Sequence, residues 1–124
     1  LVEPGVCYLS SGADYMTVHK RDNEYRLHIS PAPFASRKGA VDMLFFSAAE
    51  ALKSDCCAVV LSGLGSDGAE GVEEVIHMGG EALVQDPKTC FCKEMVTAAL
   101  YKNPEATVVA DVDVASNVTG LMAE

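Results

Sequence analysis

The chain has 124 residues, of which 49% are hydrophobic and 22% charged, and these values predict a single globular domain with its own core. Its formal net charge of −9 argues against sequence-independent nucleic-acid binding, which needs Lys and Arg to neutralise phosphates. No apolar run approaches the ~20 residues that cross a bilayer, and no basic start followed by an apolar stretch suggests a signal peptide. We therefore expect a cytoplasmic protein that neither binds nucleic acid nor inserts into a membrane.

The five cysteines show no Cys-x-x-Cys spacing, and no histidine lies at a zinc-finger distance from them. Cys56 and Cys57 are adjacent in an apolar stretch, and neighbours on one strand point to opposite faces, which disfavours a bridge between them. We expect reduced, mostly buried thiols, no metal site and no cofactor.

The first third of the chain predicts β-structure. Residues 6–10 have the composition of a strand, and residues 15–19 and 25–29 alternate between apolar and polar side chains around a polar segment at 21–24. This pattern predicts a β-hairpin with one solvated face. Pro31 and Pro33 then end the hairpin and open a loop through Lys38.

From residue 40 onward, helices and strands alternate. An apolar stripe at helical spacing covers residues 40–53, and residues 56–61 form a run without polar alternation, as in a strand buried on both faces. Further strands are predicted over 81–85 and 106–110, and further helices over 69–78, over 93–101 and after Asp113. The predicted fold class is α/β, with a doubly wound, mostly parallel sheet covered by helices on both faces. The antiparallel hairpin is expected at an edge of that sheet or as a small addition to it.

Glycines at positions 63, 65 and 68 separate the strand over 56–61 from the helix over 69–78, and a fourth, at position 71, lies in its first turn. A glycine-rich turn between a strand and a helix places functional groups at the carboxyl edge of a sheet, where open α/β folds bind ligands. Asp67 is the only ionisable side chain within the turn. Its simplest interpretation is a cap for the helix that follows it, and three functional interpretations compete with that one.

The first functional interpretation is dinucleotide binding. Gly63, Gly65 and Gly68 satisfy G-x-G-x-x-G, and Asp86 lies about 20 residues further on, where a ribose partner is expected. The acidic side chains of the turn and of the first helical turn argue against it, because they bring negative charge to the place where a pyrophosphate must bind.

The other two interpretations concern ester hydrolysis. A nucleophile elbow at Ser66 would need glycine at position 64, where this chain has Leu64. The turn therefore supplies an acid and no nucleophile. In the remaining interpretation, Asp67 is the acid of a Ser-His-Asp triad whose serine and histidine lie elsewhere, and its carboxylate orients the histidine.

Residues 62–71, SGLGSDGAEG, resemble the TGMGxDGAxG signature of the chemotaxis protein-glutamate methylesterases (CheB-type). Residues 41–47 resemble the SVDxLFxS helix of that family, residues 79–86 its GGxxxxQD segment, and residues 5–9 its GxVYxAP strand. The resemblance spans about residues 5 to 110. It implies a doubly wound α/β domain that hydrolyses methyl esters of chemoreceptor glutamates and deamidates some glutamines. In this family an N-terminal receiver domain controls the reaction, and the substrates are cytoplasmic receptor helices.

On this resemblance, Asp67 matches the triad acid, and Leu64 matches the methionine whose backbone N–H contributes to the oxyanion hole. A backbone donor is what the chemistry needs, so leucine is acceptable there. The family's nucleophile lies near the start of its domain, in a Gly-x-Ser-Thr-Gly-Gly turn, and its histidine follows about a strand later. This chain begins after both, and its histidines at 19, 28 and 77 match no catalytic position. Residues 93–96 also depart from the family's Gly-Met-Pro.

We therefore interpret residues 1–124 as a single, N-terminally incomplete methylesterase-like domain. The chain alone is expected to show no turnover, since an oriented carboxylate without nucleophile and base has nothing to orient. The alternative is a non-catalytic binding or regulatory module of the same fold. Loss of the N-terminal strand and helix is expected to uncover apolar sheet surface and to cause self-association.

Overall fold

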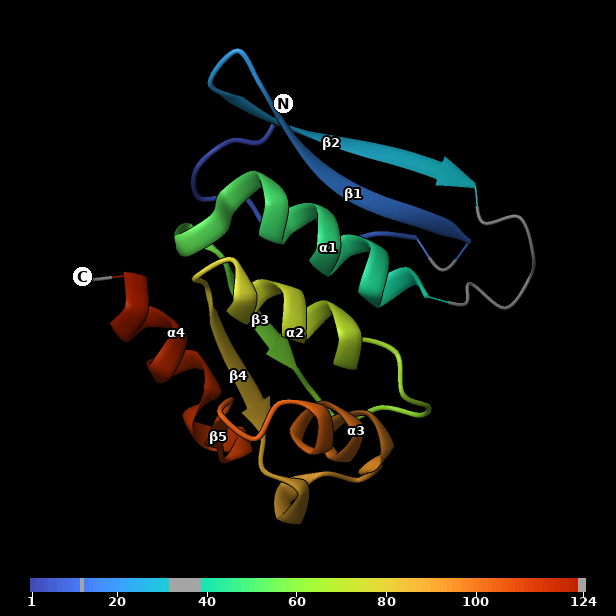
Figure 1. Cartoon of the computed structure of the whole chain (residues 1–124), viewed down its shortest axis with the longest axis vertical. Coiled ribbons are helices and arrows are strands. Elements are labelled where there is room, and N and C mark those ends of the chain that lie inside the picture. The colour runs from blue at the N-terminus through green and yellow to red at the C-terminus, as the bar shows by residue number, and fades with distance from the viewer. Residues whose placement is uncertain (12, 32–38, 123–124) are drawn as a thin grey trace.

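The structure, a computed structural model of the chain, describes residues 1–11, 13–31 and 39–122. An antiparallel hairpin precedes an alternating series of helices and parallel strands (Figure 1). The helices and strands are β1 (Asp14–Arg21), β2 (Glu24–Pro31), α1 (Ala40–Leu52), β3 (Cys57–Val60), α2 (Ala69–His77), β4 (Glu81–Gln85), α3 (Glu94–Lys102), β5 (Thr107–Val109) and α4 (Val114–Met122). Short 3-10 turns at Lys53–Asp55, Pro87–Thr89 and Asp111–Asp113 connect some of them. Within the described ranges, no helix is both long and apolar enough to span a bilayer.

The parallel sheet has the strand order β3-β4-β5, and α2 and α3 connect successive strands. Val60 pairs with Val84, and Val84 pairs in turn with Val108. The predicted parallel α/β sheet is confirmed, and each predicted helix or strand after residue 40 is present within a few residues of its expected bounds.

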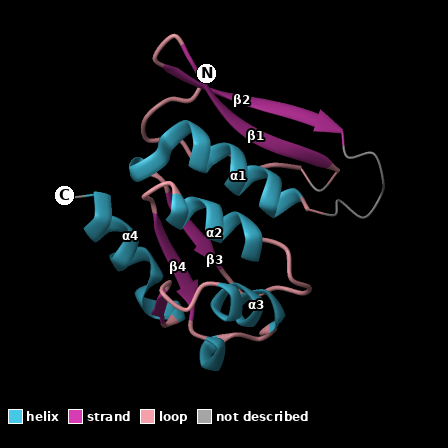
Figure 2. Cartoon of the chain, viewed as in Figure 1, coloured by secondary structure: helices cyan, strands magenta, loops and turns pink. Residues whose placement is uncertain are grey.

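The two faces of this sheet meet different helices, as Figure 2 shows. Alternate side chains on one face pack into the core with α2 and α3, and the buried members of that cluster are Val60, Val72, Ala82, Val84, Cys90, Val96, Ala99 and Ala106. On the opposite face, Glu81 and Leu83 border a cavity together with Asn117 and Leu121 of α4. Helices therefore lie on both faces, which is the layered arrangement that the sequence predicts.

The hairpin forms a two-stranded sheet of its own and packs on α1, which separates it from α2 (Figure 1). The Val18 N–H donates to Ser47 Oγ at 2.9 Å and ties β1 to the helix. A two-residue turn joins the strands, with φ of 53° at Asp22 and 63° at Asn23, the left-handed geometry of the tightest hairpins. The hairpin is thus an addition beside α1 and does not extend the parallel sheet.

Several sequence-based expectations are wrong in detail. Residues 6–10 form no strand: Leu9 is 90% exposed, and the Tyr8 hydroxyl accepts from the Glu3 N–H in a local loop. The expected strand fails because these residues have no partner strand among those described. Helix α1 ends at Leu52, since Lys53 adopts a φ of 51°. The loop expected to follow Pro31 falls largely on residues 32–38, outside the described residues.

The cysteines are free thiols, but they are less buried than expected. Cys56 and Cys90 are buried, Cys92 is half-buried, and Cys7 and Cys57 are exposed. Cys57 is exposed because alternate side chains of β3 point to opposite faces, and its neighbours Cys56 and Ala58 take the places in the core.

Candidate active site

The glycine-rich turn lies at the carboxyl end of β3 and borders a cavity of about 940 Å³. The start of α1, the turn, the start of α2 and the end of α3 all contribute to its wall. The lining residues are Gly39, Asp42, Leu64, Gly65, Ser66, Asp67, Ala69, Glu70, Ala98, Tyr101 and Lys102. Asp67 and Leu64, the two site residues expected from the sequence, therefore line the same cavity.

Glycine is required at two positions of the turn by backbone conformation. Gly65 has a φ of 78° and Gly68 a φ of 102°, values that side-chain-bearing residues rarely adopt. The loop before α3 holds the turn in place: the Gly63 N–H donates to the Cys92 carbonyl at 3.2 Å, and the Met95 N–H donates to the Gly63 carbonyl at 3.1 Å. The start of the turn is thus tied to the segment that leads into α3.

Asp67 caps a helix, although not the one that follows it. Its carboxylate accepts from the Val41 N–H at Oδ2 and from the Asp42 N–H at Oδ1, each at 2.9 Å. These are the N–H groups that a side-chain cap normally accepts, and the N-cap residue of α1 is Gly39, which has no side chain to do so. The expectation that Asp67 caps its own helix is wrong because its side chain points across to α1.

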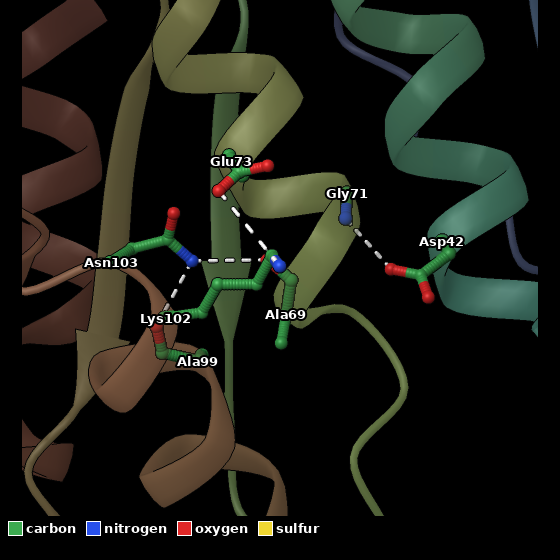
Figure 3. A network of polar contacts seen from close by, with 7 residues as sticks. All are labelled: Asp42, Ala69, Gly71, Glu73, Ala99, Lys102 and Asn103. Atoms are coloured by element: carbon green, nitrogen blue, oxygen red, sulfur yellow. Dashed lines mark hydrogen bonds and ion pairs between the residues drawn. The ribbon is translucent and has the colours of Figure 1, made fainter.

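Asp42 in turn caps α2. Its Oδ1 accepts from the Gly68 N–H at 3.0 Å and from the Gly71 N–H at 2.8 Å, and Figure 3 shows the second of these contacts. The N-cap of α2 is Gly68, which also lacks a side chain. Local sequence patterns did not reveal this role, because Asp42 and Gly68 lie 26 positions apart. Only the glycines at the N-caps of both helices hint at caps from elsewhere.

Burial raises the pKa of the Asp42 carboxyl above its ordinary value of 3.8, and the nearby Asp67 charge raises it further, while the two backbone N–H groups act in the opposite direction. Because the folded pKa is raised, the contribution of this group to stability is full below 3.8 and is lost as the pH rises through the folded pKa.

We expect the Asp42→Asn variant to lose this pH dependence, since an amide does not titrate. The free energy of unfolding of the wild type, relative to that of the variant, should therefore fall as the pH rises from below 3.8 to neutrality. Urea unfolding at a series of pH values measures this difference. A difference in unfolding free energy that stays constant across the pH series would contradict the raised pKa of Asp42.

Leu64 lines the cavity. The residue is 76% exposed. The Gly63 N–H donates to a carbonyl and the Gly65 N–H to Glu94 Oε2, but the Leu64 N–H between them has no acceptor within the described part of the chain. A backbone donor that lines a cavity without a partner is what an oxyanion hole requires. Its role as an oxyanion donor stays a prediction.

Asn103, which the sequence analysis did not single out, links α3 to the start of α2. It is fully buried, and its Nδ2 donates to the carbonyls of Ala69 and Ala99, each at 3.0 Å (Figure 3). A more exposed ion pair, between Lys102 and Glu73, joins the same two helices. An asparagine directly before Pro104, at the end of a helix, is the only sequence signal for this link.

The Asn103→Asp variant is expected to be less stable than Asn103→Ala. Aspartate replaces the donating amide with an oxygen that faces two buried carbonyls, whereas alanine removes the donor and leaves a small cavity. We expect alanine to lower the free energy of unfolding by about 1–3 kcal/mol and aspartate to lower it further. Chemical denaturation of both variants measures their order of stability. Equal stabilities would contradict the two hydrogen bonds that Asn103 donates.

The dinucleotide interpretation finds little support in this geometry. The Gly68 and Gly71 N–H groups, at the N-terminus of α2 where a pyrophosphate would bind, already donate to Asp42. Asp86 accepts from the Lys88 N–H and caps the short turn that follows it. The motif is present in the sequence, but its backbone N–H groups, which would bind the pyrophosphate, already donate to the Asp42 carboxylate.

The cavity is lined by an acid and by Leu64, whose N–H has no partner among the described residues, and none of its lining residues is a histidine. His19 and His28 lie exposed on the hairpin, where their rings meet edge to face. His77 lies in the last turn of α2, beside Glu74. The described residues thus bring the two expected site residues together without a histidine beside them.

Comparison with known proteins gives a consistent result. The CheB methylesterase family matches residues 1–118. The chain is 33% identical over 94 residues to protein-glutamate methylesterase/protein-glutamine glutaminase 2 of Vibrio vulnificus, with 75% of this chain and 27% of the relative covered. It is 39% identical over 90 residues to the corresponding enzyme 1 of Myxococcus xanthus, with 72% and 26% covered. The chain therefore spans about a quarter of the length of these relatives.

A solved structure shares the fold. The crystal structure of the Thermotoga maritima CheB methylesterase catalytic domain superposes with a TM-score of 0.87 at 24% sequence identity. The match covers 97% of this chain and 64% of that domain. About a third of the solved domain therefore has no counterpart in the chain.

Proposed function

The chain belongs to the CheB methylesterase family, and we propose that it forms the later part of a catalytic domain that hydrolyses glutamate methyl esters and deamidates glutamines on chemoreceptors. Its relatives are named protein-glutamate methylesterases, which are hydrolases. The observation that carries the proposal is that Asp67 lines one cavity together with Leu64, whose N–H has no partner among the described residues.

Asp67 is the triad acid in this proposal. Each of its oxygens accepts one backbone N–H from α1, which leaves each oxygen a further lone pair. A histidine that approaches from the cavity donates its ring N–H to this carboxylate, which fixes the tautomer and stabilises the imidazolium formed when the nucleophile is deprotonated. The bonds to α1 keep the carboxylate in place, so that no reorganisation is needed at that moment.

Leu64 contributes through its backbone. The negative charge that develops on the ester oxygen in the tetrahedral intermediate is stabilised by a donor already in place, and the Leu64 N–H is such a donor. The leucine side chain takes no part in this step, which accounts for leucine where the family has methionine. Because the contribution comes from the main chain, side-chain substitutions at position 64 should affect substrate fit more than the chemistry.

The serine and histidine of the triad come, in this proposal, from residues that precede the 124 of this chain in the parent protein. We propose that they lie in a segment equivalent to the third of the solved domain that has no counterpart in this chain. The parent protein acts in the cytoplasm on methylated receptor helices, under the control of an N-terminal receiver domain. Without the serine and histidine of the triad, the chain alone is expected to show no serine-dependent turnover.

Release of methanol from a methylated receptor fragment tests this proposal. The assay compares the 124-residue chain with the extended chain, which carries native upstream sequence to the length of the solved domain. Turnover only in the extended chain supports the proposal. Absence of turnover in both would favour the alternative, a non-catalytic binding module that has kept the fold.

Self-association of the chain alone is a further part of the proposal. β3 pairs only with β4 among the described strands, and it carries no Pro or charged residue to discourage pairing at its other edge. Cys57 and Leu61 are exposed at this strand, Leu61 by 49%. We expect dimers or larger species in light scattering at high concentration, and a monomer under those conditions would contradict this expectation.

A further inference from the structure

Asp42 and Asp67 cap each other's helices, and together they close a ring of hydrogen bonds. The Asp42 N–H donates to Asp67 Oδ1 at 2.9 Å, and the Gly68 N–H, directly after Asp67, donates to Asp42 Oδ1 at 3.0 Å. Val41 and Gly71 add one further bond on each side. We infer that Asp42 is a positioning residue for the proposed reaction, because it fixes the peptide group next to Asp67 and thereby the direction of the triad carboxylate. This inference rests on the proposed function.

The Asp42 side chain acts on Asp67 through the backbone. Its Oδ1 accepts from both Gly68 and Gly71, so it holds the N-cap and the third residue of α2 at once. The peptide group between Asp67 and Gly68 cannot rotate without breaking one of these bonds. Gly68 has a φ of 102° and lacks a side chain, so it has no side chain that could restrain this peptide group. Asp42 thus supplies a restraint that the flexible turn lacks.

The arrangement also has an electrostatic cost that a purely structural cap would avoid. Two carboxylates lie close together and partly buried, and the charge of Asp67 together with burial raises the pKa of Asp42. Serine or asparagine could cap α2 without adding a like charge. The positive ends of two helix dipoles converge on the pair and offset part of this repulsion.

An activity cycle in the extended chain tests the inference. Asp42→Ala removes the acceptor for both N–H groups, and we expect kcat per folded enzyme to fall about 10²-fold with KM little changed, the effect of a misplaced catalytic group. Asp42→Asn keeps Oδ1 and should recover at least about tenfold of this loss. Circular dichroism gives the folded fraction used for each kcat.

The double variant separates positioning from a general structural effect. If Asp42 acts through Asp67, then Asp42→Ala should cause no further loss of kcat in the Asp67→Ala background. An equal fold-loss in both backgrounds, or an Asp42→Ala variant with wild-type kcat, would overturn the inference while leaving the proposed function intact. An Asp67→Ala variant with full activity would overturn the proposed function, and the inference with it.

A second measurement needs no activity and uses the 124-residue chain. The ¹³C signal of the Asp67 carboxylate reports its surroundings directly. Both variants remove the charge of Asp42 and only Asp42→Asn keeps Oδ1, so we expect this signal to shift clearly further from its wild-type position in Asp42→Ala than in Asp42→Asn. The same shift in both variants, or a shift in neither, would show that the acceptor oxygen of Asp42 does not control the carboxylate of Asp67.

Discussion

The Asp67→Ala variant of the extended chain is expected to hydrolyse the receptor methyl ester about 10⁴-fold more slowly than the wild type. Without the carboxylate, the histidine loses the group that selects its tautomer and stabilises its protonated form. The loss should appear in kcat, measured as methanol release at saturating substrate, because Asp67 acts in the chemical step. Some activity above that of buffer should remain from the oxyanion hole and substrate binding.

A control is needed because Asp67→Ala also removes the cap of α1, which costs about 1 kcal/mol of stability. Ser47→Ala offers a matched control. It removes the bond between the hairpin and α1, costs a similar amount, and affects no residue that lines the cavity. Ser47→Ala should keep the wild-type kcat. If Asp67→Ala lost no more activity than Ser47→Ala, the triad role of Asp67 would be refuted.

The Gly71→Ala variant is expected to lower the free energy of unfolding of the chain by about 2 kcal/mol. Helices α1 and α2 pack closely at this glycine. An added Cβ would lie 2.5 Å from Phe45 Cβ and 3.2 Å from Asp42 Cα. Backbone atoms cannot rotate away as a flexible side chain can, so the helices must separate. Chemical denaturation, with the slope of the transition checked for two-state behaviour, measures the loss.

Gly120→Ala is the matched control for this prediction. Gly120 lies within α4, and no described atom outside the backbone of its own helix lies within 4 Å of the position of its added Cβ. Alanine is the better helix former by up to about 1 kcal/mol, so this variant should be as stable as the wild type or more stable. Equal destabilisation by both substitutions would refute the close contact between α1 and α2. In the extended chain, Gly71→Ala should also lower activity, because it displaces Asp42 from the turn.

Local sequence patterns predicted the helices and the parallel strands well. The unbroken apolar run before the glycine-rich turn predicted β3, and two adjacent glycines marked the end of α2. These features depend on residues that are close together in the chain, and such local patterns can be read from a single sequence. The strand expected over 6–10 failed for the converse reason: a strand needs a partner, and the sequence does not reveal whether one is present.

The site was predictable only in part. The turn and its acid stand together in the sequence, so Asp67 and Leu64 could be selected, the second through family resemblance alone. The role of Asp42 could not be found in the same way, because a cap supplied from another helix leaves no local spacing. The link from Asn103 to Ala69 joins residues 34 positions apart and was missed for the same reason.

The central claim is that Asp67 orients a histidine supplied by the upstream part of the protein. A crystal structure of the extended chain tests it through the distance from the Asp67 carboxylate oxygens to the nearest imidazole nitrogen. We expect a hydrogen bond of about 2.7–2.9 Å, with both bonds from α1 to Asp67 retained. A carboxylate bonded only to α1, with no histidine within hydrogen-bond distance, would show that Asp67 is a helix cap and that this domain carries no triad.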